Sequence, residues 1–320
     1  MVPVRVDLAT AQRFAAHDCG WSSADGDVTE IITGFGNHNW RVPLESGDVV
    51  LKIGPASSAP KWAAAQVGAD RARSAGLAVP ELFSARVVGE HVVRTLHWVD
   101  GQSAATLIGN QHAQNRLGAD LGAAVAALHT GELEGFASRL DGSSVVFPTW
   151  AGYVADRLVA IERRASACGA PEPALRHRAA ATVEELAASV SAECRPVVCH
   201  RDLHLDNLIV GPDGTLRGIV DWDMAEAWDA AGEWFKLELF LFEQLPHTRD
   251  AFDTAYEGGA GIVGADRRRL VLLIESLNVV ANAGIFSADF VDFGLRQLDS
   301  LTSTRRGKAI RRRTLWFRRP

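Results

Sequence analysis

The 320-residue chain lacks the features that define several classes of protein. It has only four cysteines and no Cys-x-x-Cys pair, which argues against a disulfide framework and against a structural zinc site. No apolar run reaches the roughly 18 residues of a membrane-spanning helix, and the first residues show no long apolar signal segment. These absences predict a protein of the reducing cytoplasm with no membrane partner.

Lysine is also scarce, and acidic residues are missing from one end of the chain. Four of the 33 basic residues are lysines, so each position that uses lysine is informative. Residues 305–320 carry eight basic groups and no acidic group, whereas residues 1–304 carry 25 basic and 39 acidic groups, a balance of −14. An acidic body repels nucleic acid and attracts cations. We therefore expect a cationic partner rather than nucleic acid.

The rest of the composition, 47% hydrophobic and 22% charged, is that of a folded protein long enough for two domains. In the first 100 residues, short runs rich in β-branched residues and separated by glycine turns predict strands. Asp7 can cap a first helix, and an alanine-rich helix ends at Gly76. The predicted helices cover residues 7–20 and 60–75, and the predicted strands cover 28–36, 39–45, 48–54, 82–89 and 91–99. This pattern indicates a small antiparallel sheet that carries a helix.

After Gly101 the pattern becomes helical. Apolar residues recur at helical spacing within residues 113–129, which predicts an amphipathic helix. Further helices are predicted at 149–167, at 172–192 and from about residue 232 onward, with short strands at 196–200, 208–210 and 216–222. We therefore predict an α+β fold with two lobes. The small antiparallel sheet lobe covers residues 1–100, the mainly helical lobe covers 101–304, and the basic tail covers 305–320.

The stretch 199–223 holds residues suited to binding a metal ion. A loop that leaves a predicted strand presents Asp202, and Asn207 follows five residues later. A predicted hairpin then returns the chain to Asp221, fourteen residues after Asn207. Carboxylate and amide oxygens are ligands that Mg²⁺ prefers, and one carboxylate remains as a base. The spacing predicts a magnesium site with a base beside it.

These motifs resemble those of the aminoglycoside phosphotransferase family, which are small-molecule kinases of the protein-kinase-like superfamily. The family pattern H-G-D-L-H-P-D-N-L resembles residues 200–208, and I-D-W-[ED] resembles residues 220–223. The resemblance covers most of the chain, because it extends to residues 34–42, 49–53, 96–101 and 117–129. The chain departs from the pattern at Arg201, which replaces a glycine, at Leu205, which replaces a proline, and at residues 228–230, which replace G-D-P.

The resemblance implies a two-lobed kinase-like fold that uses ATP and Mg²⁺. It implies that Asp202 accepts or orients the proton of the acceptor hydroxyl, and that Asn207 and Asp221 hold the metal. The nucleotide contacts that it implies are Lys52 at the phosphates, the hinge backbone at His97 and Val99, and Gly34, Gly36 and Asn37 in the first hairpin.

One part of the family pattern has no direct match in this chain. The helix after the lysine strand should carry a glutamate that pairs with Lys52, but no glutamate occurs between Lys52 and Glu81. Gln66 and Asp70 are both candidates for this partner, and the sequence does not choose between them. Arg201 is expected to form a structural salt bridge, because the chain has no long activation segment to which it could bind.

The predicted function is ATP- and Mg²⁺-dependent phosphorylation of a hydroxyl group on a small cationic antibiotic, which would make the protein a resistance enzyme. The acids expected to hold the cation are Asp223, Glu226, Asp229 and Glu233. The same scaffold could instead phosphorylate a metabolite such as choline, homoserine or a thioribose, or serve biosynthesis or self-protection. A third reading is a non-catalytic nucleotide-binding protein that acts through a partner. The use of ATP rather than GTP stays open.

Overall fold

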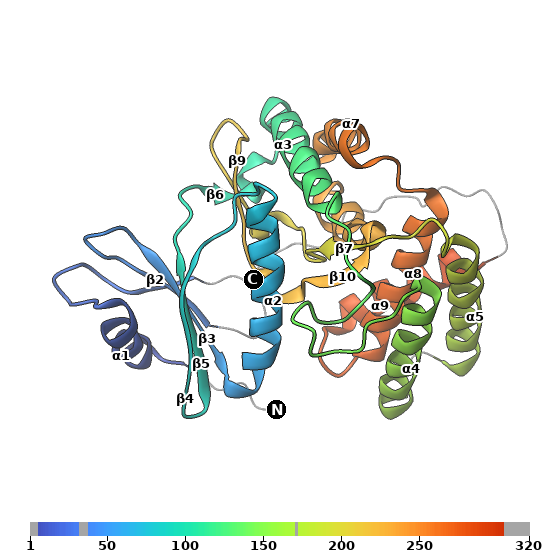
Figure 1. Ribbon diagram of the computed structural model, residues 1–320, viewed down its shortest axis with the longest axis horizontal. Coiled ribbons are helices and arrows are strands. Elements are labelled where there is room, and N and C mark those ends of the chain that lie inside the picture. Colours follow the sequence, from blue (N-terminus) through green and yellow to red (C-terminus); the bar gives the residue numbers. More distant parts are fainter. Residues whose placement is uncertain (1–5, 32–37, 170–171, 304–320) are drawn as a thin grey trace.

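The computed structural model describes residues 6–31, 38–169 and 172–303. Two parts lie side by side, an antiparallel sheet with two helices and a larger group of helices (Figure 1). The sheet has the strand order β1-β2-β3-β5-β4. Its strands are β1 (Thr29–Ile31), β2 (His38–Val42), β3 (Val49–Pro55), β4 (Leu82–Val88) and β5 (His91–His97). The sheet and the helices together confirm the predicted α+β fold class.

Strand β3 is central because it is apolar toward one face of the sheet and carries Lys52 on the other. Leu51 and Ile53 are fully buried and share a core with helix α1 (Leu8–Cys19). The Asp7 carboxylate begins that helix by accepting the N–H of Thr10 at 2.8 Å, as the sequence predicts. Because side chains alternate along a strand, Lys52 points to the opposite face. The strand thus directs Lys52 toward the helical part of the molecule.

Helix α2 (Ala59–Ser74) lies between the sheet and the helical part (Figure 1). Its buried residues Ala69 and Ala72 belong to the larger hydrophobic core, not to the core that α1 forms with the sheet. Gly68 allows the close approach, since a Cβ there would lie 2.9 Å from the Cβ of Ala225. Helix α2 is therefore fixed to the segment that follows Asp221.

The helical part surrounds the larger core. Its helices are α3 (Gln111–His129), α4 (Trp150–Cys168), α5 (Pro173–Val190), α6 (Trp234–Lys236), α7 (Arg249–Ala260), α8 (Ala265–Ala281) and α9 (Ala288–Thr302). No helix among the described residues is both long and apolar enough to cross a membrane.

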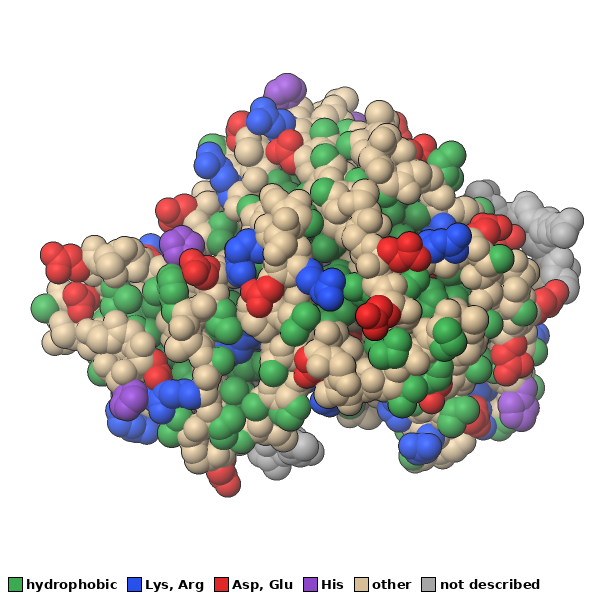
Figure 2. Space-filling model, in the orientation of Figure 1, with side chains coloured by type: hydrophobic (Ala, Val, Ile, Leu, Met, Phe, Trp, Pro, Cys, Tyr) green, Lys and Arg blue, Asp and Glu red, His purple; other side chains and the backbone are tan. Residues whose placement is uncertain are grey.

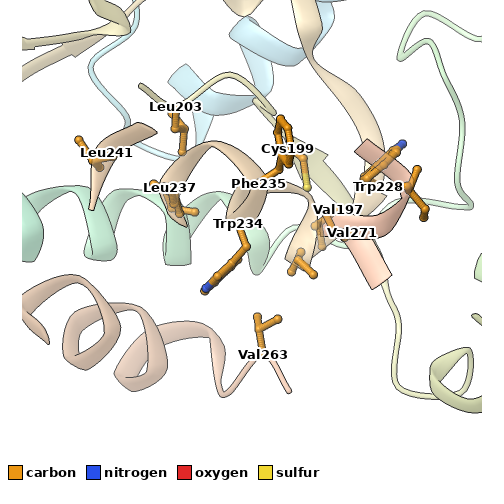
Figure 3. Close-up of a cluster of buried hydrophobic side chains, with 14 of the residues drawn as sticks. Val197, Cys199, Leu203, Trp228, Trp234, Phe235, Leu237, Leu241, Val263 and Val271 are labelled. Carbon is orange, nitrogen blue, oxygen red and sulfur yellow. The ribbon is translucent and has the colours of Figure 1, made fainter. Parts of the chain in front are cut away.

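Two small sheets lie within this part and carry the predicted catalytic segment. Strand β7 (Pro196–Cys199) pairs antiparallel with β10 (Glu226–Asp229), and β8 (Leu208–Val210) lies between β6 (Gln102–Ser103) and β9 (Leu216–Ile219). Figure 3 shows side chains from β7, from the loop after it and from the α6 region in one buried cluster. The labelled members are Val197, Cys199, Leu203, Trp228, Trp234, Phe235, Leu237, Leu241, Val263 and Val271. The loop after β7 is therefore anchored in the hydrophobic core.

The predicted elements exist, but several are shorter than expected. The strand expected at 216–222 ends at Ile219, because Asp221 adopts a left-handed backbone with φ 59°. The helix expected from about residue 232 is broken into a short 3₁₀ helix (Ala230–Glu233), α6 and a π-helical segment (Leu237–Leu241). Both differences occur where the chain turns its polar side chains toward the candidate site.

Helix α3 crosses the segment before α7 at close range, and this crossing makes a testable prediction. A Cβ at Gly118 would lie 2.2 Å from the carbonyl oxygen of Thr248, so Gly118→Ala must push backbone apart. We expect it to lower the free energy of unfolding by about 1–3 kcal/mol, measured by urea denaturation. Gly258 in α7 has open space around it, so Gly258→Ala should instead stabilise the protein, by up to about 1 kcal/mol. Equal effects of the two variants would contradict this packing.

Candidate active site

The predicted catalytic residues lie on one loop and on the hairpin that follows it. The loop leaves β7 at Cys199 and carries Asp202, and Asn207 ends a short 3₁₀ helix just before β8. The N–H of Val220 donates to the carbonyl oxygen of Asn207 at 3.0 Å, which closes the hairpin next to Asp221. The Asn207 Nδ2 donates to the carbonyl oxygen of Asp202 at 2.9 Å and to its Oδ2 at 3.1 Å. The local sequence therefore brings the three side chains to one place.

Two non-glycine residues in this region have a left-handed backbone. The φ angles are 64° at Arg201 and 59° at Asp221. Such a conformation costs roughly 1–2 kcal/mol for a residue with a side chain. The glycine that the family pattern has at position 201 fits this geometry, whereas Arg201 must be held in it by its surroundings.

Glu233 holds the strained loop through its backbone. Its side chain is 0% exposed, and its carboxylate accepts the N–H groups of His200 at 2.5 Å and Arg201 at 2.8 Å. The sequence predicts Glu233 as a substrate contact. This prediction is wrong, because the Glu233 side chain is buried and both of its carboxylate oxygens accept hydrogen bonds from the loop backbone.

The side chain of Arg201 forms the structural salt bridges that the sequence predicts. Its guanidinium pairs with Glu226 and Glu275 and lies 3.9 Å from the centre of the Trp228 ring. Burial lowers the pKa of Arg201, but the two carboxylates outweigh burial and raise that pKa above its usual value. Arg201 therefore stays charged in the core and fixes the loop from its side-chain end.

Glu226 and Asp229 are also occupied within the protein. Glu226 accepts hydrogen bonds from Arg157 at 3.2 Å and from the Tyr153 hydroxyl at 3.0 Å, in addition to its pair with Arg201. Asp229 is 1% exposed and pairs with Arg267 at 2.6 Å. The prediction that these two acids face a cationic substrate is corrected, because Oε2 of Glu226 and both carboxylate oxygens of Asp229 are directed at arginines.

Asp202 lies in a partly open position with a lysine beside it. Its Oδ1 is 2.9 Å from the Nζ of Lys236, and its side chain is 21% exposed. Burial raises the pKa of Asp202, but the nearby His204 side chain and the charge of Lys236 outweigh burial and hold that pKa well below its usual range. The group is therefore an ionised carboxylate at neutral pH. Lys236 is a site residue that was not predicted from the sequence, and the scarcity of lysine was the signal available for it.

Lys52 connects the sheet to the catalytic hairpin. Its Nζ is 2.9 Å from Oδ1 of Asp221 and 2.8 Å from Oδ2 of Asp223. Burial lowers the pKa of Lys52, but the charges of Asp223 and Asp221 outweigh burial and raise that pKa, so the ammonium is retained. Asp223, expected at the substrate, is instead 10% exposed and also lies 3.4 Å from a nitrogen of Arg94.

Among the described residues, neither Gln66 nor Asp70 forms a hydrogen bond with Lys52. The Gln66 Oε1 accepts from Arg94 at 2.5 Å, and its Nε2 donates to Asp70 at 2.8 Å. Within the described part of the chain, the hydrogen-bond acceptors of the Lys52 ammonium are Asp221 and Asp223. The acid that partners the lysine thus comes from the catalytic hairpin, and Gln66 supports it indirectly through Arg94.

The other predicted nucleotide contacts are in the first hairpin and at the hinge. Gly34, Gly36 and Asn37 lie outside the described residues. The N–H of His97 donates to the carbonyl oxygen of Glu81 at 2.8 Å, so this donor is used within the protein. The side chain of Val99 lies against Gly218 of β9, where a Cβ would be 2.9 Å away. Contacts of His97 and Val99 with adenine stay predictions.

The donor set around Asp221 suits a magnesium ion. Asp221 is 35% exposed and uses Oδ1 for Lys52. Because the Nδ2 of Asn207 is turned to Asp202, its Oδ1 is directed away from that carboxylate. Burial raises the pKa of Asp221, and the Lys52 charge outweighs burial and lowers it, so the carboxylate is ionised. A carboxylate and an amide oxygen are ligands that Mg²⁺ accepts.

The Glu233 contacts make a prediction about stability. Glu233→Gln keeps the size of the side chain but leaves one acceptor for two buried N–H groups. We expect a loss of about 1–3 kcal/mol in the free energy of unfolding, measured by urea denaturation. Glu193→Gln changes an exposed acid near β7 and serves as the matched control. If both variants unfold at the wild-type urea concentration, Glu233 does not hold the loop.

Three solved structures share this fold over almost their whole length. Aminoglycoside phosphotransferase APH(4)-Ia has a TM-score of 0.70 at 16% identity, over 92% of this chain and 98% of that chain. A putative fructosamine-3-kinase from Haemophilus somnus 129PT has a TM-score of 0.69 at 15% identity, over 91% and 96%. Spectinomycin phosphotransferase APH(9)-Ia, solved with ADP and spectinomycin, has a TM-score of 0.57 at 13% identity, over 91% and 93%.

The sequence itself points to the same group of proteins. No curated protein sequence matches this chain. The model of the phosphotransferase enzyme family matches residues 27–271, which include Lys52 and the whole catalytic hairpin. Because that match spans most of its length, the chain belongs to the phosphotransferase enzyme family.

Proposed function

We propose that the protein transfers the γ-phosphoryl group of ATP to a hydroxyl group of a small molecule, with Mg²⁺ as cofactor. The observation that carries the proposal is the meeting of Asp202, Asn207 and Asp221 on one hairpin, with Lys52 of the sheet 2.9 Å from Asp221. Structures of APH(4)-Ia variants in complex with AMP-PNP or ADP support ATP as the donor. Catalysis of phosphoryl transfer consists of positioning and charge neutralisation, which these carboxylate, amide and ammonium groups can supply.

Each residue has a distinct role in this proposal. The Asp202 carboxylate is ionised and partly exposed, so it can orient the acceptor hydroxyl and take its proton. A carboxylate with a lowered pKa is a weak base, which suits a loose transition state in which the proton leaves late. Lys52 binds the phosphates of the nucleotide. Asn207 and Asp221 would hold Mg²⁺, which neutralises charge on the transferred group.

Two observations bear on the class of acceptor. Our first candidate is a small hydroxylated antibiotic, inactivated by phosphorylation, because the structural neighbours include enzymes solved with hygromycin B and with spectinomycin. The balance of −14 in residues 1–304 would attract a cation over a distance. The structure gives no ready cation pocket from the four acids expected to form one, since each has internal partners. Figure 2 likewise shows acidic and basic side chains interspersed on the face in view.

A metabolite is the second candidate, and fold similarity supports it as well as it supports an antibiotic. The TM-score with the putative fructosamine-3-kinase, 0.69, is close to that with APH(4)-Ia, 0.70. Fold similarity therefore does not favour an antibiotic over a sugar-derived metabolite. Both candidates can be tested in one screen, in which ADP formation is measured with aminoglycosides, macrolides, nucleosides, choline, homoserine, a thioribose and a fructosamine. ADP formation that no acceptor stimulates, together with no resistance in a sensitive bacterium, would contradict the proposal.

The role of Asp202 makes a prediction about turnover. Asp202→Ala should lower kcat by about 10²–10⁴-fold, because it removes the group that orients and deprotonates the acceptor. Affinity for MgADP should stay close to that of the wild type, since the nucleotide contacts are on other residues. Asp213→Ala, an exposed aspartate in the turn of the same hairpin, should retain full turnover and is the control. Wild-type kcat in the Asp202 variant would disprove the assignment.

A further inference from the structure

One helical turn contacts the catalytic loop at two points. Glu233 binds the backbone N–H groups of His200 and Arg201, and Lys236, three residues later, lies 2.9 Å from Oδ1 of Asp202. Residues three apart share a helix face, so both contacts come from the same side. The chain then enters the π-helical segment Leu237–Leu241. Such segments are rare and occur frequently at functional sites.

The Lys236 ammonium is held in place but remains accessible. Its side chain is 23% exposed, and the Nζ lies 4.6 Å from the centre of the Phe240 ring, which is a favourable cation–π distance. An ammonium has three N–H donors, so one carboxylate does not exhaust them. Lys236 can therefore bind a second anion next to Asp202.

Asp202 does not need a cation to hold its position. Asn207 donates to both its carbonyl and its carboxylate oxygen, and the N–H of Asp202 donates to Nδ1 of His200 at 3.2 Å. These contacts already fix the backbone and the side chain. The Lys236 ammonium is thus not needed to place the Asp202 carboxylate.

The identity of the residue is informative as well. The chain has four lysines among 33 basic residues, and two of them, Lys52 and Lys236, contact aspartates of the site. An arginine would bind the carboxylate with two parallel hydrogen bonds and stay locked there. Lysine is a compact point charge on a flexible stem, which can move between two nearby anions.

We propose that Lys236 binds the γ-phosphoryl group of ATP from the helical part of the molecule, while Lys52 binds the nucleotide from the sheet. The inference rests on the proposed function, because the acceptor oxygen must lie at Asp202 and the phosphorus about 3–3.5 Å from it for reaction. The Lys236 Nζ is within hydrogen-bond reach of the same carboxylate. When ATP binds, the ammonium moves toward the phosphoryl oxygens and leaves Oδ1 of Asp202 to the acceptor hydroxyl.

The test compares two nucleotides that differ by one phosphoryl group and needs no knowledge of the acceptor. Affinities of the full chain for ADP and for AMP-PNP, each with Mg²⁺, are measured by calorimetry. Lys236→Met should weaken AMP-PNP binding about 10- to 100-fold, which is the usual effect of a lost hydrogen bond to a charged group. ADP binding should not change. Lys236→Arg keeps the charge but can bind the Asp202 carboxylate through two hydrogen bonds, so it should recover only part of the AMP-PNP affinity that Lys236→Met loses.

Two further variants complete the test, one as a control and one as a second neutral substitution. Lys61→Met changes an exposed lysine on α2 and should leave both affinities unchanged. Lys236→Gln is a second neutral variant in case the methionine does not fold. The inference is overturned if the neutral variants bind AMP-PNP as the wild type does, or if they lose both nucleotides equally. A wild-type protein that binds neither nucleotide would disprove the proposed function itself, whereas an unchanged preference in Lys236→Met would remove only the role of Lys236.

Discussion

The hydrogen bonds from two loop N–H groups to the Glu233 carboxylate are the contacts on which the candidate site depends. Arg201 has a left-handed backbone, a conformation that a non-glycine residue keeps only when its surroundings require it. Glu233 is fully buried, so these hydrogen bonds do not compete with water. The turn that they fix directs Asp202 out of the core. This clamp fixes the backbone of the loop from which the Asp202 side chain reaches Asn207.

Buried ion pairs then join this clamp to the rest of the helical part. Arg201 contacts Glu226 of β10 and Glu275 of α8, and Arg157 of α4 approaches both of these acids. A buried charge network of this kind is stable when every member has a partner, and removal of one partner leaves an uncompensated charge. The network therefore ties three elements to the catalytic loop. It also holds Glu226, one of the acids that follow Asp221, against arginines inside the protein.

A second ion-pair network joins the sheet to the same hairpin. Lys52 of β3 binds Asp221 and Asp223, and Arg94 of β5 binds Asp223 and Gln66. Helix α2 packs its small residues on the core of the helical part, with Gly68 against Ala225. The two parts of the molecule thus meet at residues that surround the hairpin. Asp223 pairs with Lys52, a role for which Gln66 and Asp70 were the candidates in the sequence.

The sequence alone determined the elements and the local chemistry of the site. Apolar periodicity and glycine turns were sufficient to predict the sheet, its helix and the later helices, because these patterns depend on neighbours within a few residues. The Asp7 cap and the hairpin that carries Asn207 and Asp221 are equally local. What the sequence did not determine was the partner of each charged group. Arg201 and Glu275 are 74 residues apart, and Lys52 and Asp223 are 171 residues apart. Only the tertiary structure decided that Glu226, Asp229 and Glu233 face arginines and backbone amides and that Lys236 faces Asp202. A carboxylate gains little from a distant cation in water, but in the core it must have a partner, and the packing of distant elements selects that partner.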